Sequence, residues 1–177
     1  GDAASLYFAQ FNELILQRKD FFEFQSRVKR PPTDAVNALL SFAYAILAND
    51  FAAALEGVGL DAYVGFLHRD RPGRMSLALD LMEEFRSVIA DRCVLTLINN
   101  RMLSKKDFVL QEDGAVLLND TGRKIFLEAW QKRKQDVIMH PFLNEKLPIG
   151  LLPFVQAQLL ARCLRKDLDE YPGYLWK

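Results

Sequence analysis

The sequence has few residues of several informative kinds. Among 177 residues there are two cysteines and two histidines, and the formal net charge is zero. No apolar run approaches the roughly 20 residues that a membrane span needs, and we find no signal peptide, internal repeat or low-complexity tract. With a net charge of zero, the composition gives no indication of nucleic-acid binding. Such a function would depend on local clusters of Arg and Lys.

The cysteines indicate the redox environment. Cys93 and Cys163 both fall within apolar helical patterns, so we expect free thiols buried in the core rather than a disulfide or a pair of metal ligands. This usage fits a reducing cytosol. The chain begins at Gly1 without a methionine, and we expect it to be a fragment or a processed piece.

The composition predicts a folded domain. Half of the residues are hydrophobic and 26% are charged, which is typical of a globular protein. We expect one helical domain over residues 1–177, in which residues 1–33 form a leading helix and a linker. Phe8 and Phe11 recur at helical spacing, and Pro31 and Pro32 interrupt the pattern.

Apolar periodicity predicts further helices. A long, largely buried helix follows a cap at Thr33 or Asp34 and ends with Gly57 as its C-cap. A second helix runs from Ser76 to about residue 100, with an acidic face opposite its apolar face. The acidic face carries Asp80, Glu83, Ser87 and Asp91.

The remaining segments complete a mainly α fold with one small β-hairpin. Asp113 and Gly114 predict the hairpin because they separate two short β-type runs. Asp120 or Thr121 can cap another helix, a loop with His140 follows, and a last helix covers about 151–168. We expect a structural role for His140.

Four residues form a candidate metal site. Glu56 ends the long helix, His68 lies in the next loop, and Asp80 and Glu83 are three residues apart on the following helix, so they share a face. Carboxylates and neutral imidazoles bind divalent metals. From spacing alone, a solvated acidic surface is the simpler interpretation. Phosphate contact and a soluble surface are equally compatible with the nearby arginines, which are Arg69, Arg71, Arg74 and Arg86.

Particular strings resemble a known family. NALLSFAYAIL, ALEGVGLDAYVGFLH and GRMSLALDLMEEFR are similar to the CRISPR-associated integrase that acquires new spacers. RPPTDAVNALLSF, INNRMLSKKDF, DGAVLLND and QLLARCLRKDLDEYPGYLW follow in that family's order. The resemblance covers essentially the whole chain and implies the C-terminal helical catalytic lobe, without the N-terminal β-rich lobe that pairs the subunits.

The resemblance implies roles for the candidate residues. The metal ligands would be Glu56, His68 and Glu83, with Asp80 in a supporting role, and the ion would be Mg²⁺ or Mn²⁺. The reaction would be attack of a 3′-hydroxyl on the DNA backbone of a CRISPR repeat, or hydrolysis where water attacks. No Ser-His or Cys-His pair suggests a covalent protein intermediate. Arg69, Arg71, Arg74 and Arg86 would contact phosphates.

The resemblance also implies partners and a location. The partners would be the incoming spacer DNA, the CRISPR repeat, a second copy of the full-length protein and the small companion protein two of the adaptation complex, in the cytoplasm of a prokaryote with no membrane association. Two alternatives belong to other classes: a non-catalytic helical module that grips DNA or a partner, and a helical phosphohydrolase for small molecules.

Overall fold

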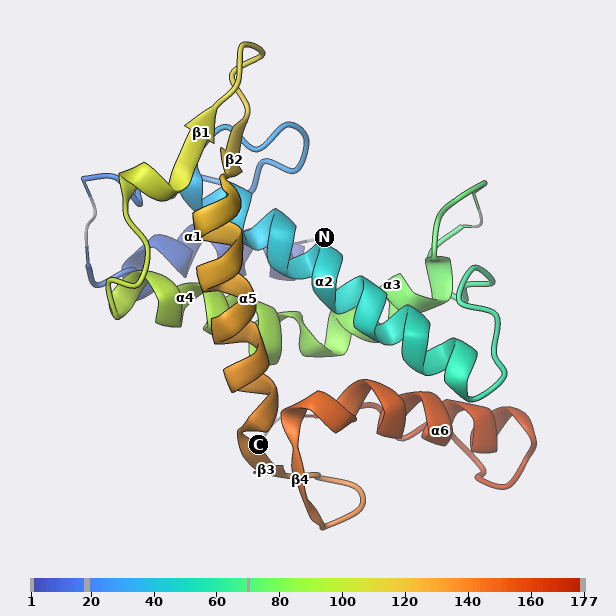
Figure 1. The fold of residues 1–177 in the computed structure, drawn as a ribbon. Coiled ribbons are helices and arrows are strands. Elements are labelled where there is room, and N and C mark those ends of the chain that lie inside the picture. Colours follow the sequence, from blue (N-terminus) through green and yellow to red (C-terminus); the bar gives the residue numbers. More distant parts are fainter. Residues whose placement is uncertain (1, 18–19, 70, 176–177) are drawn as a thin grey trace. The chain divides into compact units, whose positions relative to one another are not determined.

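The computed structural model describes residues 2–17, 20–69 and 71–175, with the side chains of residues 2 and 3 excepted (Figure 1). The described helices are α1 (Asp2–Phe11), α2 (Ala35–Gly57), α3 (Ser76–Met82), α4 (Arg92–Asn99), α5 (Asp120–Gln135) and α6 (Leu152–Leu164). The strands are β1 (Phe108–Leu110), β2 (Val116–Leu118), β3 (Val137–Met139) and β4 (Lys146–Pro148). The prediction of a mainly α fold is confirmed.

The contacts divide the chain into two compact units. Residues 1–43 and 91–131 form the first, and residues 44–90 and 132–177 form the second. The expectation of one domain over residues 1–177 stays a prediction. All four candidate metal-site residues and all four candidate arginines belong to the second unit.

The first unit confirms two local predictions and corrects one. The Asn37 N–H donates to Asp34 Oδ1 at 2.8 Å, so Asp34 caps α2. β1 and β2 pair antiparallel, and Gly114 has the positive φ of 82° that the predicted turn requires. The predicted cap of α5 at Asp120 or Thr121 is wrong. The side chain of Asn119 accepts the Gly122 N–H at 2.9 Å instead.

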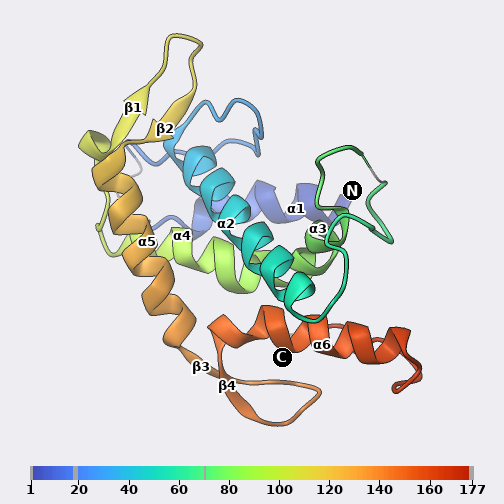
Figure 2. The same cartoon turned by 45° about the vertical axis from the view of Figure 1, so that its right-hand side comes forward.

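The second unit contains a hairpin that the sequence analysis missed. β3 and β4 pair antiparallel where a loop around His140 was predicted, so the described residues contain two hairpins rather than one. Each strand has three residues, and their connection lacks the tight Asn-Gly or Asp-Gly signal of a short hairpin. Figures 1 and 2 both show α6 running alongside the C-terminal end of α2.

The end of α2 differs in detail from the prediction. Gly57 is the last residue of the helix, but the left-handed conformation that stops it lies at Gly59, with φ 81°. The Gly59 N–H donates to the Glu56 carbonyl at 3.0 Å, and the Leu60 N–H donates to the Leu55 carbonyl at 2.9 Å. Gly57 is therefore a helical residue and not the C-cap.

α2 corrects the expectation that no apolar segment is long enough to span a membrane. Within the described residues, this 23-residue helix is long and apolar enough to cross a membrane by length and composition. Much of it is buried in the protein, including Leu39, Leu40, Leu47 and Phe51. A core helix passes the same test, so the signal is weak.

The predicted helix from Ser76 to about residue 100 changes type along its path. After α3, residues Glu83–Phe85 are 3₁₀ and residues Arg86–Asp91 are π-helical, before α4 continues to Asn99. Its predicted acidic face is not uniformly solvated, because Asp80 and Asp91 are buried. Asp91 accepts the Tyr7 hydroxyl at 2.7 Å. The two cysteines are free, as predicted; Cys93 is buried and Cys163 is partly exposed.

Candidate active site

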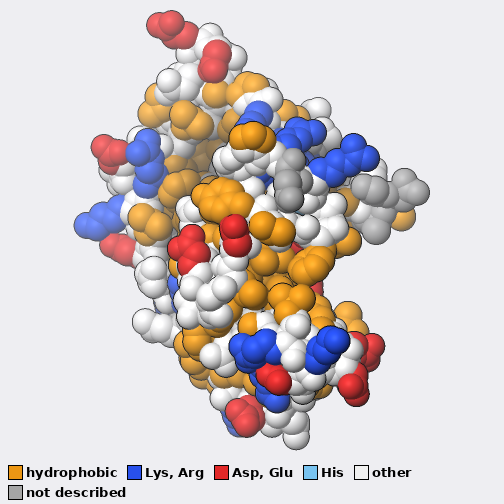
Figure 3. Space-filling model, turned by 90° about the vertical axis from the view of Figure 1, so that its right-hand side faces the viewer, with side chains coloured by type: hydrophobic (Ala, Val, Ile, Leu, Met, Phe, Trp, Pro, Cys, Tyr) orange, Lys and Arg blue, Asp and Glu red, His pale blue; other side chains and the backbone are white. Residues whose placement is uncertain are grey.

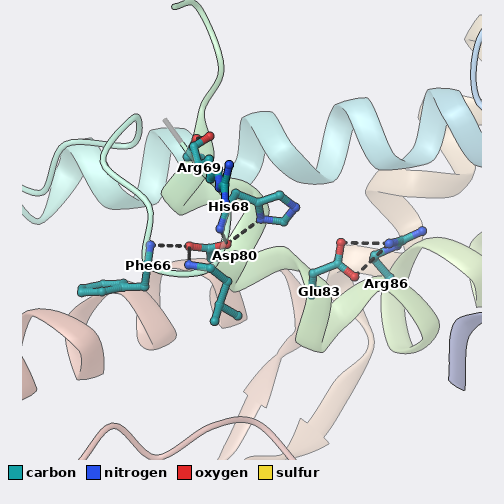
Figure 4. Close-up of polar contacts among 8 residues, drawn as sticks. Phe66, His68, Arg69, Asp80, Glu83 and Arg86 are labelled. Carbon is teal, nitrogen blue, oxygen red and sulfur yellow. Dashed lines mark hydrogen bonds and ion pairs between the residues drawn. The ribbon is translucent and has the colours of Figure 1, made fainter. Parts of the chain in front are cut away.

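The loop before α3 is wrapped around one buried carboxylate. Asp80 Oδ2 accepts the N–H groups of Phe66 and Leu67 at 2.7 and 2.9 Å, and Oδ1 accepts the N–H of His68 at 3.0 Å (Figure 4). Three successive backbone donors facing one point form a nest for an anion. The side chain of Asp80 fills that nest, so these donors are not available to a substrate phosphate.

Gly65 allows this close approach. A Cβ at Gly65 would stand 2.7 Å from Ser76 Cβ, 2.8 Å from the His68 carbonyl oxygen and 3.1 Å from Asp80 Oδ2. Two of those three neighbours are backbone or are held by it, so they cannot move aside cheaply. The glycine in the string GFLH therefore serves packing, while the residues after it carry the polar contacts.

Asp80 also fixes the imidazole of His68. The distance from His68 Nδ1 to Asp80 Oδ1 is 2.5 Å. Burial raises the pKa of Asp80, but the hydrogen bonds from Leu67, His68 and Phe66 outweigh burial and leave that pKa below 3.8. An ionised carboxylate can only accept, so Nδ1 carries a proton, and in the neutral ring Nε2 presents its lone pair. The side chain of His68 is 28% exposed, which leaves a ligand access to it.

Glu83 lies one turn after Asp80 and is bound to Arg86. Arg86 Nη1 donates to both carboxylate oxygens of Glu83 at 2.8 Å, and its guanidinium lies 4.2 Å from the centroid of the Tyr44 ring. Burial lowers the pKa of Arg86, but Tyr44 and Glu83 outweigh it and raise that pKa. Figure 4 shows the imidazole of His68 on the side of Asp80 on which Glu83 lies.

The neighbouring acid, Glu84, was not predicted as a site residue. Its Oε2 accepts the N–H of Tyr174 at 2.7 Å, and both the Tyr171 hydroxyl and Gln156 Nε2 at 3.3 Å. Burial raises the pKa of Glu84, and these three hydrogen bonds only partly offset that effect. The string MEEF places two acids side by side, but it does not show that Glu83 is exposed while Glu84 is partly buried.

Glu56 does not join the contact between His68 and Asp80. It is exposed at the end of α2, and the described residues contain no cluster of three or more His, Cys, Asp or Glu side chains arranged to hold a metal. The structure thus brings His68 to Asp80 and leaves Glu56 and Glu83 outside that contact. The ligand role of Glu56 stays a prediction.

The four arginines fall into two groups. Arg69 and Arg71 are exposed on the loop after His68, and Arg74 is partly exposed where the loop turns into α3. The Arg74 N–H donates to the Arg71 carbonyl at 3.0 Å, which forms that turn. Arg86 is separate from them because Glu83 and Tyr44 engage its guanidinium.

Apolar side chains accompany the loop arginines, which the sequence analysis did not single out. Phe66 is 66% exposed and Leu67 is 83% exposed, although Asp80 fixes the backbone of both. Tyr63 and Val64 are exposed as well. The face that carries the end of α2, this loop and α6 mixes hydrophobic with charged side chains (Figure 3). The string YVGFLH contained the signal, as an apolar run directly before a candidate ligand.

Comparisons with known proteins agree with the resemblance. The family model described as CRISPR associated protein Cas1 matches residues 1–132. The CRISPR-associated endonuclease Cas1 2 of Rhodospirillum rubrum is 58% identical over 177 residues, which are 100% of this chain and 52% of that protein. The CRISPR-associated endonuclease Cas1 of Leptospira interrogans is 48% identical over 100% of this chain and 69% of that protein. The chain thus spans about half the length of the first of these relatives.

Two solved structures share the fold. A casposase bound to integration product superposes with a TM-score of 0.88 at 27% identity, over 99% of this chain and 50% of that one. A chain of a Cas6-RT-Cas1--Cas2 complex gives a TM-score of 0.81 at 26% identity, over 100% of this chain and 19% of that one.

Proposed function

The chain belongs to the Cas1 family, and on this premise we propose that it is the catalytic lobe of a metal-dependent DNA integrase and endonuclease that inserts new spacers into a CRISPR array. The observation that carries the proposal is the His68–Asp80 pair. Asp80 binds Nδ1 of the imidazole and leaves Nε2 for a ligand, and Glu83 follows Asp80 by one turn of helix. A histidine that binds a metal typically donates its other ring N–H to a carboxylate, as His68 does to Asp80.

The donor set suits a divalent cation. His68 Nε2 and the Glu83 carboxylate would hold Mg²⁺ or Mn²⁺, with Glu56 as the third predicted ligand. When bound, the ion would supply charge stabilisation to the scissile phosphate and to the leaving 3′-oxygen. The pair of Glu83 with Arg86 does not close the site, because the Glu83 side chain is 46% exposed and remains accessible to an ion.

The other residues position the reactants. The ionised Asp80 accepts the Nδ1 proton of His68 and so orients the ring with Nε2 available to the ion. Arg69, Arg71 and Arg74 would bind backbone phosphates near His68, which a neutral protein can do through such a local cluster. The exposed ring of Phe66 would stack on a nucleobase beside them.

The nucleophile belongs to the substrate. In integration, the 3′-hydroxyl of the incoming DNA would attack a phosphate of the repeat and displace the 3′-oxygen of the repeat strand. In endonuclease activity, water would attack in its place. Neither route needs a covalent bond between the protein and DNA.

Partners follow from the similar structures as part of this proposal. One of them is named as bound to an integration product, and another as a complex that contains Cas2. We expect this chain, within the complete protein, to bind the incoming spacer DNA, the CRISPR repeat and Cas2, and to act as a homodimer.

The test separates catalysis from binding. In the complete protein, Glu83→Gln and His68→Ala should each abolish Mn²⁺-dependent integration and cleavage of branched DNA, while DNA affinity stays within about threefold of the parent because the loop arginines remain. Unchanged activity in both variants would refute the proposed site. A parent protein that binds DNA but never cleaves or integrates it would indicate a non-catalytic module instead.

Glu56→Gln answers the remaining question about ligands. We predict that it abolishes integration as well. Normal integration by this variant with Mn²⁺ would remove Glu56 from the ligand set and leave the other two assignments standing.

A further inference from the structure

We propose that the C-terminal tail, residues 171–175, together with Gln156, is a positioning strap that sets the place of Glu83. The inference rests on the proposed function, in which Glu83 binds the metal. The helix that carries Glu83 leaves α geometry at Glu83, because Glu83–Phe85 are 3₁₀ and Arg86–Asp91 are π-helical.

Irregular helical turns depend on contacts from outside. 3₁₀ turns have poorer hydrogen-bond geometry than α turns, and π segments are rare and often lie at functional sites. The path of residues 83–91 is therefore not fixed by helix propensity alone. Val88 illustrates this, because its carbonyl accepts Arg133 Nη2 at 2.9 Å from a distant part of the second unit.

The tail holds the two residues that directly follow Glu83. Glu84 Oε2 accepts the Tyr174 N–H at 2.7 Å and the Tyr171 hydroxyl at 3.3 Å. The ring of Tyr174 lies 4.6 Å from that of Phe85, centroid to centroid, and both rings are buried. A polar contact and an apolar contact thus fasten the tail to consecutive residues of the irregular turn.

Gln156 joins the strap to α6 and has one orientation. The Leu143 N–H donates to His140 Nδ1 at 3.2 Å, so the ring proton lies on Nε2 and points at Gln156 Oε1, 3.1 Å away. The amide Nε2 of Gln156 must then face the opposite way. It donates to the Tyr171 hydroxyl at 2.6 Å and to Glu84 at 3.3 Å.

This network reaches from a buried histidine to the residue beside a candidate ligand. His140 and Gln156 are fully buried, whereas Glu83 is exposed. Glu83 therefore projects from a turn that is anchored behind it, and its carboxylate is exposed where it pairs with Arg86. Partners that orient a metal ligand typically change metal affinity or activity by about 10- to 100-fold when they are removed.

Removing one hydroxyl tests the strap. Tyr171→Phe in the complete protein keeps the ring and deletes the hydrogen bonds of the hydroxyl with Glu84 and Gln156. We expect Mn²⁺ to bind about 10-fold more weakly, measured by calorimetric titration of Mn²⁺ alone. kcat for branched-DNA cleavage should fall, while KM for DNA stays at the parent value, because the loop arginines are untouched.

Tyr7→Phe is the matched control. It deletes another tyrosine hydroxyl bound to a carboxylate, that of Asp91, in the first unit. It should lower the melting temperature without changing Mn²⁺ affinity. Glu84→Gln is the second variant of the strap, since it removes the charge that the strap binds and keeps the shape of the side chain. It should weaken Mn²⁺ binding in the same way, and it replaces Tyr171→Phe should that protein not fold.

The outcomes separate the strap from the site. A strap variant that melts earlier yet binds Mn²⁺ as tightly as the parent would overturn the proposal, because its role would then be structural only. Mn²⁺ binding by His68→Ala that equals the parent's would instead overturn the proposed function, and the strap with it. Weaker binding in both His68→Ala and Tyr171→Phe, with Tyr7→Phe unchanged, supports both.

Discussion

His68 Nδ1 lies 2.5 Å from Asp80 Oδ1, and the same oxygen accepts the backbone N–H of His68 at 3.0 Å. One carboxylate thus fixes both the ring and the main chain of a single residue. The two contacts orient Nε2 without any ligand present, so the imidazole is preorganised for a metal and loses little freedom when one binds.

Replacing Asp80 should therefore act on metal affinity. In Asp80→Asn the side chain keeps its shape, but it loses the charge and one of its two acceptor oxygens. We expect Mn²⁺ affinity to fall by about 10- to 100-fold in a calorimetric titration. Asp107→Asn is the control, because Asp107 is also buried and accepts the N–H of Ser104 at 2.8 Å, far along the chain in the first unit. Equal losses in both variants would contradict a specific role for Asp80.

Asp80 should also make the folding stability of the metal-free protein depend on pH in the acid range. The pKa of folded Asp80 is lower than its unfolded value of 3.8, so the unfolded state binds the proton first as pH falls. The stability due to Asp80 is complete above the unfolded value and is lost as pH falls through the folded value. Asp80→Asn should cost about 2 kcal/mol at neutral pH, and the difference from the parent should shrink in acid. Denaturant unfolding over this range measures it.

The contribution of Glu84 to folding stability should depend on pH in the opposite direction from that of Asp80, and Glu84→Gln tests this. Burial raises the pKa of folded Glu84 above its ordinary value, so the folded state binds the proton more tightly than the unfolded state does. The contribution of Glu84 is present below the unfolded value and is lost as pH rises through the folded value. The parent should lose stability relative to Glu84→Gln over that rise. A difference that stays constant with pH would contradict the buried, ionisable state of Glu84.

The sequence predicted what depends on local pattern. Apolar periodicity identified α2 and the helix after Ser76, and Asp113-Gly114 identified the first hairpin, because the information for each lies within a few residues. The hairpin of β3 and β4 was missed for the same reason. Its connection lacks the local Asn-Gly or Asp-Gly signal, and its surroundings include distant contacts such as that between His140 and Gln156.

The candidate site shows the same limit. Spacing placed Asp80 and Glu83 on one helical face, yet the two carboxylates have different surroundings. Asp80 is buried under the loop of residues 66–68, and Glu83 is exposed beside Arg86. Helical periodicity cannot distinguish them, because the loop that covers Asp80 comes from 12 to 14 residues earlier in the chain. The 3₁₀ and π turns after Met82 were equally invisible, since their residues contact distant parts of the chain such as Arg133 and Tyr174.

Gly65→Ala should damage the loop around Asp80. The added methyl group would overlap Ser76 Cβ and the His68 carbonyl, and such overpacking costs about 1–3 kcal/mol. We expect lower stability together with weaker Mn²⁺ binding. In Gly57→Ala the new Cβ would meet a single atom, Phe154 Cε2, at 4.0 Å, so that helical variant should be neutral or more stable. Thermal unfolding compares the two, and a harmless Gly65→Ala would refute the close approach.

The loop arginines should control DNA affinity through charge alone. Arg71→Ala should weaken binding to all DNA sequences alike and reduce the slope of log affinity against log salt by about 1. Arg165→Ala is the control, because Arg165 is also exposed but pairs with Asp167 at 3.2 Å beyond α6. Binding isotherms at several salt concentrations give both slopes. A slope that changes equally in the two variants would indicate a diffuse effect of net charge.

Phe66 should act through its ring and not through charge. Its backbone N–H is held by Asp80 at 2.7 Å while its side chain is 66% exposed, so the ring is presented at low entropic cost beside the loop arginines. Stacking contributes about 1–3 kcal/mol per base, and Phe66→Ala should therefore weaken binding to branched DNA by about 10-fold. Phe66→Trp should retain affinity, and Phe142→Ala, which removes another exposed ring of the second unit, should not change it. If Phe66→Ala binds DNA normally but loses its association with Cas2, the ring contacts protein and the stacking role is refuted.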